Sequence, residues 1–277
     1  MSDLGFRTVR PHPELRHLVR RYVGYRQHDV TLSRHRGLPS GSLTMIVSFA
    51  EPVRVVDGPG VTGRSGKMSL VAGLHLRRAL IEQDPYQYGM HIELDPLGAY
   101  ALLGVPAMAL TSEVIGTEDL PVRWGRDLAG RLAELPGWAD RFALLDRELR
   151  AALRPVPAAG EIGWAWRHLR ATSGASPVTG LAGEIGWSRR HFSERFGREV
   201  GLPPKQAARL VRFERSAALI RAGRPLAEVA AEGGFYDQAH LTKEWRVLAG
   251  CTPGTWIAEE LPFLQEGERT GTAESVT

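Results

Sequence analysis

Two segments of the sequence carry polar side chains of the kinds that read the edges of DNA bases. Within residues 181–204 and 229–253 the apolar positions recur at helical spacing, which predicts in each segment a helix with one buried face. The opposite faces are predicted to expose Arg189, Arg190, Ser193 and Glu194 in the first segment, and Gln238, Ala239, Thr242, Lys243 and Arg246 in the second. Arg and Lys donate to guanine, Gln pairs with adenine, Glu accepts from cytosine, and Ser and Thr serve either way. These types indicate hydrogen bonding in a major groove, with a merely solvated surface as the alternative for any one residue.

The two segments follow one repeated pattern. Before the turn the offset is 48 residues and pairs Gly186 with Gly234, whereas after the turn it is 49 and pairs Ser188 with Asp237. One residue inserted in the second turn accounts for the change. Self-similarity of this kind is the signature of repeated structural units, so both segments are predicted to fold alike.

Each copy contains the parts of a helix-turn-helix, which needs a short helix, a tight turn and a capped second helix. Gly186 and Gly234 allow the positive backbone angle of a tight turn. Ser188 and Asp237 are good N-caps, because their side-chain oxygens can accept from a backbone N–H of the first helical turn.

Residues 203–223 lie between the copies and are predicted to form one long helix, with Arg209, Arg212 and Arg215 among its apolar positions. Such a helix is about 25–30 Å long. Successive major grooves on one face of B-DNA are about 34 Å apart, so one chain could place both units in DNA.

The C-terminal third thereby resembles the DNA-binding domain of the AraC/XylS transcription regulators. The resemblance covers residues 161–258 and includes both units, the connecting helix and the segment GFYDQAHLTKEWRVLAGCTPGTW at 234–256. In that family the base-reading residues lie early in each second helix. The resemblance therefore implies as readers Arg190, Ser193, Glu194, Gln238, His240, Thr242 and Lys243. Arg189 and Arg246 complete the predicted DNA-binding set.

The sequence departs from the family pattern at a few positions. Leu241 and Trp245 stand where the family usually has phenylalanine, and Trp256 where it usually has tyrosine. These are exchanges between apolar residues. Glu194 stands where many members carry arginine, which predicts that the first unit is the less cationic reader and the second contributes more of the phosphate attraction.

The segment RPVPAAG at 154–160 is typical of a linker, because it concentrates Pro, Ala and Gly between two helical patterns. We therefore predict an α+β domain at 1–153, an all-α tandem helix-turn-helix domain at 161–260 and a flexible tail at 267–277. In the first domain, β-prone runs at 43–49, 53–56, 68–74 and 88–94 indicate an antiparallel sheet or small barrel. Helical spacing then runs from Trp124 to Leu149, broken at Pro136-Gly137.

The function of residues 1–153 has three alternatives. Segments 38–49 and 98–120 are similar to an uncharacterised domain that is often fused to this DNA-binding domain in actinobacteria, and the resemblance implies no ligand. The domain could bind a small effector or RNA polymerase and so alter regulation, it could form a ligand-free homodimer contact, or it could be an enzyme. No nucleophile with a matching base and no cofactor loop occurs in 1–153, which disfavours an enzyme and predicts no catalytic residue.

Charge and composition fit a nucleic-acid binder. The net charge is +4, and residues 158–258 hold 14 Lys and Arg against nine Asp and Glu, so the positive excess lies in the C-terminal part. A basic domain is the electrostatic footprint expected of a protein whose partner is double-stranded DNA.

Several other classes of site and location are disfavoured. The single cysteine, Cys251, excludes an intramolecular disulfide and any multi-cysteine zinc site. The histidines of the first domain lack metal-site spacing, so neither a metal nor a cofactor is expected. With no signal-peptide pattern and no run of about 18 apolar residues, we expect a cytoplasmic protein without a membrane partner.

Overall fold

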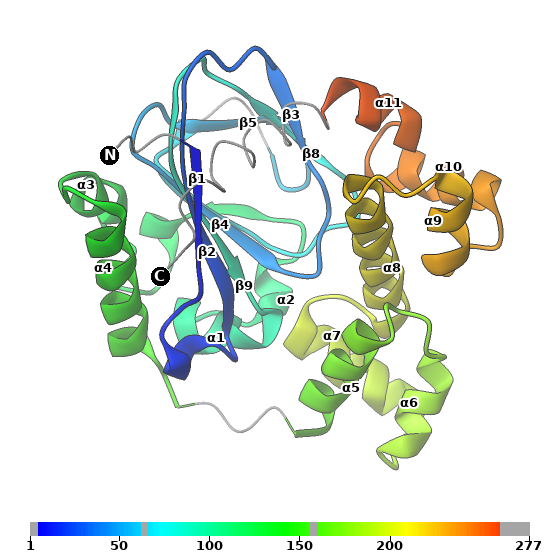
Figure 1. Cartoon of the computed structure of the whole chain (residues 1–277). Coiled ribbons are helices and arrows are strands. Elements are labelled where there is room, and N and C mark those ends of the chain that lie inside the picture. The colour runs from blue at the N-terminus through cyan, green and yellow to red at the C-terminus, as the bar shows by residue number, and fades with distance from the viewer. Residues whose placement is uncertain (1–4, 62–65, 156–159, 261–277) are drawn as a thin grey trace.

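A computed structural model describes residues 5–61, 66–155 and 160–260 of the chain. A sheet-rich N-terminal domain is followed by seven helices, which lie along one side of it (Figure 1). This confirms the predicted fold class, an α+β domain followed by an all-α one.

The N-terminal domain is built from two antiparallel sheets. The first has six strands, in the spatial order β1 (Gly5–Val9), β2 (Val19–Gln27), β9 (Gln87–Leu94), β4 (Leu43–Ser48), β7 (Ser69–Ala72) and β10 (Val114–Gly116). The second has four, in the order β3 (Arg34–Gly37), β8 (Ala79–Glu82), β5 (Val53–Asp57) and β6 (Gly66–Lys67). Four helices complete the domain: α1 (Ala99–Leu103), α2 (Ala107–Leu110), α3 (Leu128–Ala133) and α4 (Trp138–Ala152).

One face of the six-stranded sheet is apolar and is covered by helices. Leu43, Met45 and Val47 of β4 alternate along the strand, so they point to the same face, and all three are fully buried. α4 approaches this sheet closely, because a Cβ on Gly24 of β2 would lie 2.4 Å from the Trp138 ring. Gly24 therefore makes room for the tryptophan.

The C-terminal helices comprise α5 (Gly160–Ala171), α6 (Val178–Glu184), α7 (Arg189–Val200), α8 (Pro204–Arg221), α9 (Leu226–Glu232), α10 (Gln238–Leu248) and α11 (Pro253–Glu259). Their buried side chains fall into two clusters. The first continues from the N-terminal domain through α5, α6, α7 and the first half of α8. The second holds the rest of α8 with α9, α10 and α11, and among the described hydrophobic residues of the N-terminal domain only Leu38 and Leu76 pack against it. The first unit therefore shares its core with the sheet domain, while the second has a core of its own.

The sequence predicted four of the strands and overlooked others. β4, β5, β7 and β9 lie within or beside the predicted runs, while β1, β2, β3, β6, β8 and β10 were not predicted. The helix predicted to start near Trp124 begins only at Leu128. Trp124 is buried in the preceding loop, where its Nε1 donates to the Leu102 carbonyl at 3.1 Å, so tertiary packing rather than a helix accounts for its spacing.

The predicted linker is described only in part, and the predicted tail is not described. Residues 156–159 of the linker and the whole predicted tail at 267–277 lie outside the described residues. No helix in the described part of the chain is long and apolar enough to cross a membrane.

Candidate DNA-binding surface

The structure repeats the sequence pattern residue by residue. α6 and α9 begin and end at positions 48 residues apart, and α7 begins 49 residues before α10. Gly186 and Gly234 both adopt positive φ, +71° and +73°, between the two helices of each unit. Both segments are therefore helix-turn-helix units, as the sequence predicted.

The second helix of each unit starts with the expected cap. Ser188 Oγ accepts from the His191 backbone N–H at 3.2 Å, and Asp237 Oδ1 accepts from the His240 N–H at 2.7 Å. Each capped histidine also lies edge-on against the aromatic residue of its turn, with centroids 4.5 Å apart for Trp187–His191 and 5.6 Å for Phe235–His240. Cap and ring contact together fix how α7 and α10 leave their turns.

The predicted readers of the first unit lie together on the exposed side of α7. Arg189, Arg190, Ser193 and Glu194 are all exposed, whereas Phe192 between them is buried. Arg190 pairs with Glu194 at 3.0 Å across one helical turn, with 89% of its side chain exposed. Glu194 thus neutralises part of the positive charge of this helix.

The predicted readers of the second unit are less uniform. Gln238, Lys243 and Arg246 are exposed on α10, and no described carboxylate forms an ion pair with either cation. Thr242 is only half-buried, and its Oγ1 donates to the Gln238 carbonyl at 2.9 Å. His240 is exposed, but its Nδ1 accepts from the Tyr236 backbone N–H at 3.2 Å. Thr242 and His240 therefore use part of their hydrogen-bonding capacity within α10 and the turn before it.

Tyr236 is a surface residue that the sequence reasoning missed. Its side chain is 92% exposed, and it lies between the end of α9 and the start of α10. Tyr236 is the residue inserted in the second unit, because Phe235 matches Trp187 and Asp237 matches Ser188. The change of offset from 48 to 49 was therefore the signal that could have found it.

The buried face of α10 is anchored to α8. Trp245 is fully buried, and its Nε1 donates to Ser216 Oγ at 2.9 Å. On the rim of this contact, Arg209 of α8 donates to Glu244 of α10 at 2.5 and 3.1 Å. A bidentate pair of this kind fixes orientation as well as distance, so α8 sets the direction of the second reading helix.

The first unit is docked on the N-terminal domain. The C-terminal end of α7 packs against α2, where Thr111 Oγ1 donates to the Gly201 carbonyl at 2.6 Å. Gly201 has φ +98°, and a Cβ there would lie 2.9 Å from Thr111 Oγ1. Trp166 of α5 is fully buried and donates to Asp95 Oδ2 at 3.3 Å, and burial raises the pKa of Asp95. The start of α7, which carries the predicted readers, is free of these contacts.

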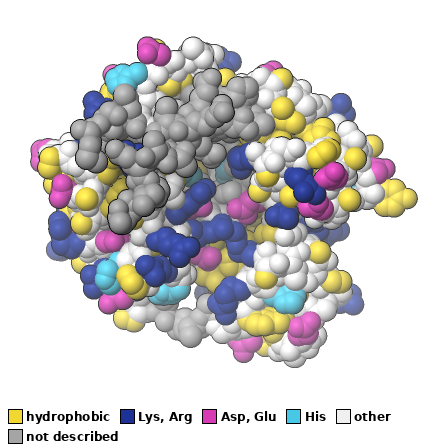
Figure 2. All heavy atoms as spheres, in the orientation of Figure 1, with side chains coloured by type: hydrophobic (Ala, Val, Ile, Leu, Met, Phe, Trp, Pro, Cys, Tyr) yellow, Lys and Arg dark blue, Asp and Glu magenta, His cyan; other side chains and the backbone are white. Residues whose placement is uncertain are grey.

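A charged contact joins α8 to the sheet domain in the region where Lys and Arg side chains gather (Figure 2). Glu214 of α8 accepts from the Gly41 N–H at 3.2 Å and lies 3.4 Å from Arg20 and 3.7 Å from Arg170. Arg170 in turn donates to the Gly41 carbonyl at 2.9 Å. Arg20 and Arg170 are therefore engaged in contacts between the domains.

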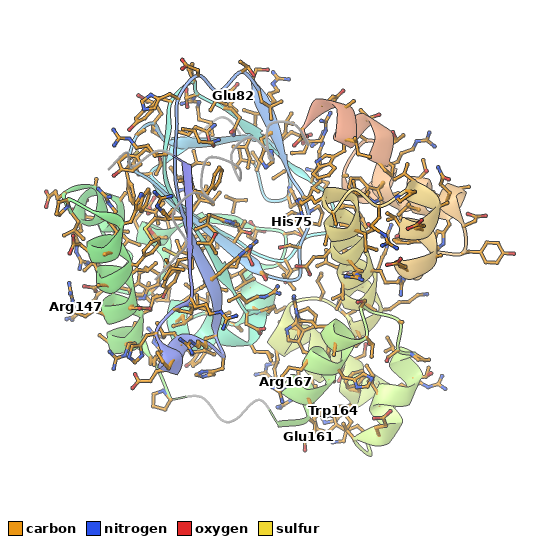
Figure 3. The ribbon with its side chains drawn as sticks, in the orientation of Figure 1. His75, Glu82, Arg147, Glu161, Trp164 and Arg167 are labelled. Atoms are coloured by element: carbon orange, nitrogen blue, oxygen red, sulfur yellow. The ribbon has the colours of Figure 1, made fainter. Side chains whose placement is uncertain are left out.

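Several side chains lie outside the predicted set of DNA-binding residues. Glu161, Trp164 and Arg167 lie on α5, beside the first unit, and Arg147 lies on α4, across the N-terminal domain (Figure 3). Cys251 is buried, as expected for a small apolar residue. Within residues 5–61, 66–155 and 160–260, His, Cys, Asp and Glu form no group that could hold a metal ion.

We expect loss of a cap to destabilise the unit that it begins. Asp237→Ala leaves a backbone N–H of α10 without its acceptor and should lower the free energy of unfolding by about 1 kcal/mol. Urea denaturation followed by circular dichroism measures this. Asp237→Asn keeps an accepting oxygen and is the matched control, so equal losses in both variants would contradict the capping role.

Two family models match the chain, one in the N-terminal part and one in the C-terminal part. Residues 181–259 match a family described as a helix-turn-helix domain (HTH_18), which is of the AraC type. Residues 7–116 match a domain of unknown function, DUF6597. A search of curated proteins finds no match.

Solved structures of ToxT from Vibrio cholerae share the fold of nearly the whole chain. ToxT from strain O395 has a TM-score of 0.51 at 10% sequence identity, covering 92% of this chain and 98% of that one. ToxT from strain SCE256 with bound unsaturated fatty acid has a TM-score of 0.51 at 9% identity, covering 93% and 96%. At this identity the likeness concerns the fold, namely a sheet-rich domain followed by two helix-turn-helix units. Residues 181–259 thus form a helix-turn-helix domain of the AraC type with two capped units, and residues 7–116 belong to a DUF6597 domain, within a fold that is shared with ToxT.

Proposed function

We propose that the protein binds specific double-stranded DNA by placing α7 and α10 in successive major grooves. The observation that carries this proposal is the pair of capped helices, each with a buried apolar face and an exposed polar first turn. The readers are Arg189, Arg190, Ser193, Glu194, Gln238, His240, Thr242, Lys243 and Arg246. The division between the reading part and residues 1–153 falls in the linker at 154–160.

The connecting helix supports reading by a single chain. α8 has 18 residues and spans about 27 Å at a rise of about 1.5 Å per residue. Units held at its two ends are separated by somewhat less than one turn of B-DNA, which is about 34 Å. The side chains of each reading helix extend beyond its backbone and can span the remaining distance of several Å.

The two units are proposed to contribute differently. Lys243 and Arg246 give α10 two cations without a described carboxylate partner, whereas Arg190 of α7 is paired with Glu194. The second unit therefore supplies more of the attraction to phosphates, and the first contributes selectivity. We also propose that Tyr236, which is 92% exposed just before α10, packs against the DNA backbone beside the groove.

Selection of bound fragments from random DNA tests the proposal directly. We expect an enriched site with two half-sites whose centres are about 10 base pairs apart. Retention of all sequences equally at every salt concentration would contradict specific recognition. The enriched sequence then serves as the probe for the variants below.

Lys243→Ala is expected to weaken binding of that probe and to flatten its dependence on salt. Loss of one phosphate contact reduces the slope of log K against log salt by about 0.9. Fluorescence anisotropy at several salt concentrations measures both quantities. Arg147→Ala removes an exposed cation on α4, far from the units, and should change neither (Figure 3). Equal effects of the two substitutions would show that only overall charge matters.

We further propose that the N-terminal domain senses a small-molecule effector and passes the signal to the reading helices. The shared core of the sheet domain and the first unit supports this coupling. The fold also accommodates small acids elsewhere, since ToxT structures hold an unsaturated fatty acid and (E)-4-(8-methylnaphthalen-1-yl)but-3-enoic acid. A ligand-free homodimer contact or a site for RNA polymerase is the alternative. Analytical ultracentrifugation together with a thermal-shift ligand screen separates these functions.

A further inference from the structure

The hydrogen-bonding state of the His240 ring is set by the turn that precedes α10. The Tyr236 backbone N–H donates to His240 Nδ1 at 3.2 Å. An imidazole nitrogen accepts a hydrogen bond only when it carries no hydrogen, so the hydrogen of the neutral ring lies on Nε2. The Phe235 ring lies edge-on against the imidazole, with centroids 5.6 Å apart, and supports this orientation. His240 therefore presents Nε2 as a hydrogen-bond donor.

The residue inserted in the second unit supplies the N–H that His240 accepts. In each unit the aromatic residue of the turn donates its N–H back to a carbonyl of the first helix, at 2.9 Å for Trp187 and 3.0 Å for Phe235. In the first unit Trp187 is also the residue four positions before His191, so its N–H is already engaged. In the second unit the insertion places Tyr236 four positions before His240, and the Tyr236 N–H reaches the ring. The fixed donor is a property of the second unit, since no N–H of the described residues donates to the His191 ring.

His240 Nε2 is available to a partner outside the chain. His240 is exposed, and among the described residues none forms a hydrogen bond with Nε2. Its neighbours Gln238 and Ala239 are exposed as well, and Ala239 carries no polar side-chain atom. The first turn of α10 thus offers two polar side chains to a groove: the Gln238 amide, which can donate and accept, and His240, which can only donate.

The four bases differ in what they offer to such a donor in the major groove. Guanine presents two acceptors, N7 and O6, whereas cytosine presents only its amino donor. Thymine offers one acceptor, and adenine offers one acceptor beside a donor amino group. A side chain that can only donate therefore gains most at guanine and finds no acceptor at cytosine.

We propose that His240 selects a guanine in the half-site of the second unit, by a hydrogen bond from Nε2–H to an acceptor of that base. Tyr236 makes this choice through its backbone N–H, which fixes the ring as a donor, so it is a positioning residue for His240. The inference rests on the proposed placement of α10 in a major groove and deepens it, because it names the base that one reader takes. The first unit, in which His191 lacks this contact, does not share the restriction.

Nitrogen NMR of the isotope-labelled full chain tests the fixed ring without DNA. At alkaline pH, where imidazoles are neutral, we expect His240 in the Nε2–H form alone and His191 as a mixture of both neutral forms. The two sets of signals are assigned from their loss in His240→Asn and His191→Asn. A His240 ring that carries its hydrogen on Nδ1, or that exchanges between both forms as His191 does, would overturn the fixed donor.

Two substitutions separate the roles of the two ring nitrogens. Asn places an oxygen near the position of Nδ1, so His240→Asn keeps an acceptor for the Tyr236 N–H but loses the donor to the base. In selection from random DNA, its preference for guanine should disappear at one position and remain unchanged elsewhere in the site. Gln places an amide near the position of Nε2 and can both donate and accept, so His240→Gln should shift that preference toward adenine. His28→Asn, at an exposed histidine of the sheet domain, is the control and should select the same site as wild type.

A cycle of one substitution and one base change measures the contact itself. Inverting the chosen G·C pair should weaken binding by wild type about tenfold, the usual size for one mismatched pair, and binding by His240→Asn by less than about twofold. Because the cycle compares ratios within each protein, any loss of stability in the variant cancels. Equal losses in both proteins would overturn the reading of guanine by His240, and so would a uniform weakening on all sequences, which is the result expected for a phosphate contact.

The outcomes distinguish this inference from the function on which it rests. If wild type selects no DNA sequence, the proposed DNA binding fails whatever the state of the His240 ring. If wild type selects a site but the guanine preference survives in His240→Asn, DNA binding stands and only the role of His240 fails.

Discussion

Trp245→Ala should unfold the second helix-turn-helix unit and abolish binding of the selected DNA. The Trp245 ring is fully buried between Phe213 and Trp256, with centroids 5.0 and 5.5 Å away, and its Nε1 donates to Ser216. Removing a buried tryptophan side chain costs about 3–5 kcal/mol, because both its contacts and the packing around the cavity are lost. The second unit has a small core of its own, so it has few other contacts to offset that loss.

The first unit should survive this substitution, because its core continues into the sheet domain. Hydrogen exchange followed by mass spectrometry distinguishes the two units. We expect loss of protection in α9, α10 and α11 but not in α5 and α7. Trp245→Phe keeps an aromatic ring and is the control, with a smaller cost from the lost hydrogen bond to Ser216. Retained protection across α10 in Trp245→Ala would show that the second unit does not depend on this ring.

The sequence predicted the reading helices well because their determinants are local. An N-cap at Ser188, a glycine at Gly186 and an apolar stripe through Phe192 each act within a few residues, and the repeat showed each of them twice. The helical period predicted less well the exposure of residues at the edge of the apolar face. Thr242 adjoins the buried Leu241 and is therefore half-buried rather than exposed.

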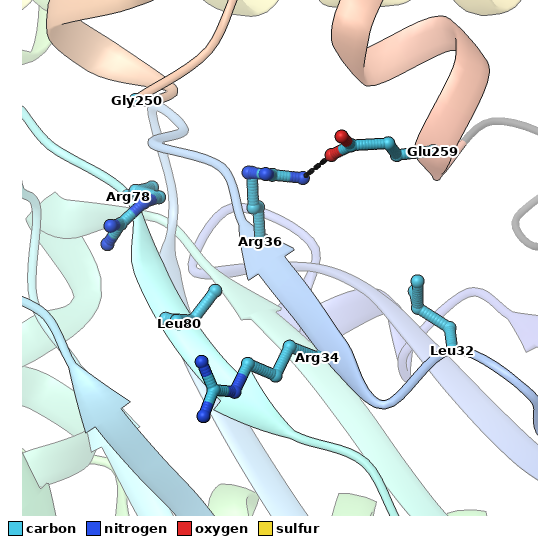
Figure 4. A pocket seen from close by; sticks show the side chains of 7 residues that line it. All are labelled: Leu32, Arg34, Arg36, Arg78, Leu80, Gly250 and Glu259. Carbon is cyan, nitrogen blue, oxygen red and sulfur yellow. Dashed lines mark hydrogen bonds and ion pairs between the residues drawn. The ribbon is translucent and has the colours of Figure 1, made fainter.

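Strands and domain contacts were harder to predict because their determinants lie far away in the sequence. β3 reads Arg34-His35-Arg36-Gly37 and has no apolar alternation, and its His35 and Arg36 instead bind Glu260, which directly follows α11. Likewise, the apolar pattern of a helix or strand predicts that one face is buried but does not tell which element covers that face. Nothing near Thr111 indicates that its hydroxyl will donate to Gly201, about 90 residues later. The cleft lined by Arg34, Arg78 and Glu259 is a product of such distant pairings (Figure 4).

Glu260→Ala should release α11 from the sheet domain. The Glu260 side chain is fully buried, and its carboxylate lies 2.9 Å from His35 Nδ1 and accepts from the Arg36 guanidinium at 2.8 Å and the Arg36 N–H at 3.0 Å. Its removal leaves the Arg36 N–H and the His35 ring without their acceptor, whereas the Arg36 guanidinium keeps Glu259 at 2.7 Å. A buried donor that loses its partner costs about 1–3 kcal/mol. Hydrogen exchange in α11 and thermal denaturation measure the effect. Glu259→Ala is the matched control, because Glu259 also binds Arg36 but is 49% exposed, and an exposed pair contributes about 1 kcal/mol or less.

The same contact predicts how stability depends on pH. Burial alone would raise the pKa of Glu260, but its contacts with His35 and Arg36 outweigh burial and hold the pKa below the usual value. A carboxyl group whose pKa is lower in the folded state stabilises the fold above its unfolded pKa, near 4.3, and this stability is lost as the pH falls through the folded pKa. Glu260→Gln cannot ionise, so its deficit relative to wild type should be full near neutral pH and should shrink as the pH falls below about 4. Thermal denaturation of both proteins across this range measures the difference. A deficit that stays constant with pH would mean that Glu260 acts through its shape and not through its charge, and that the ion pair does not hold the second unit in place.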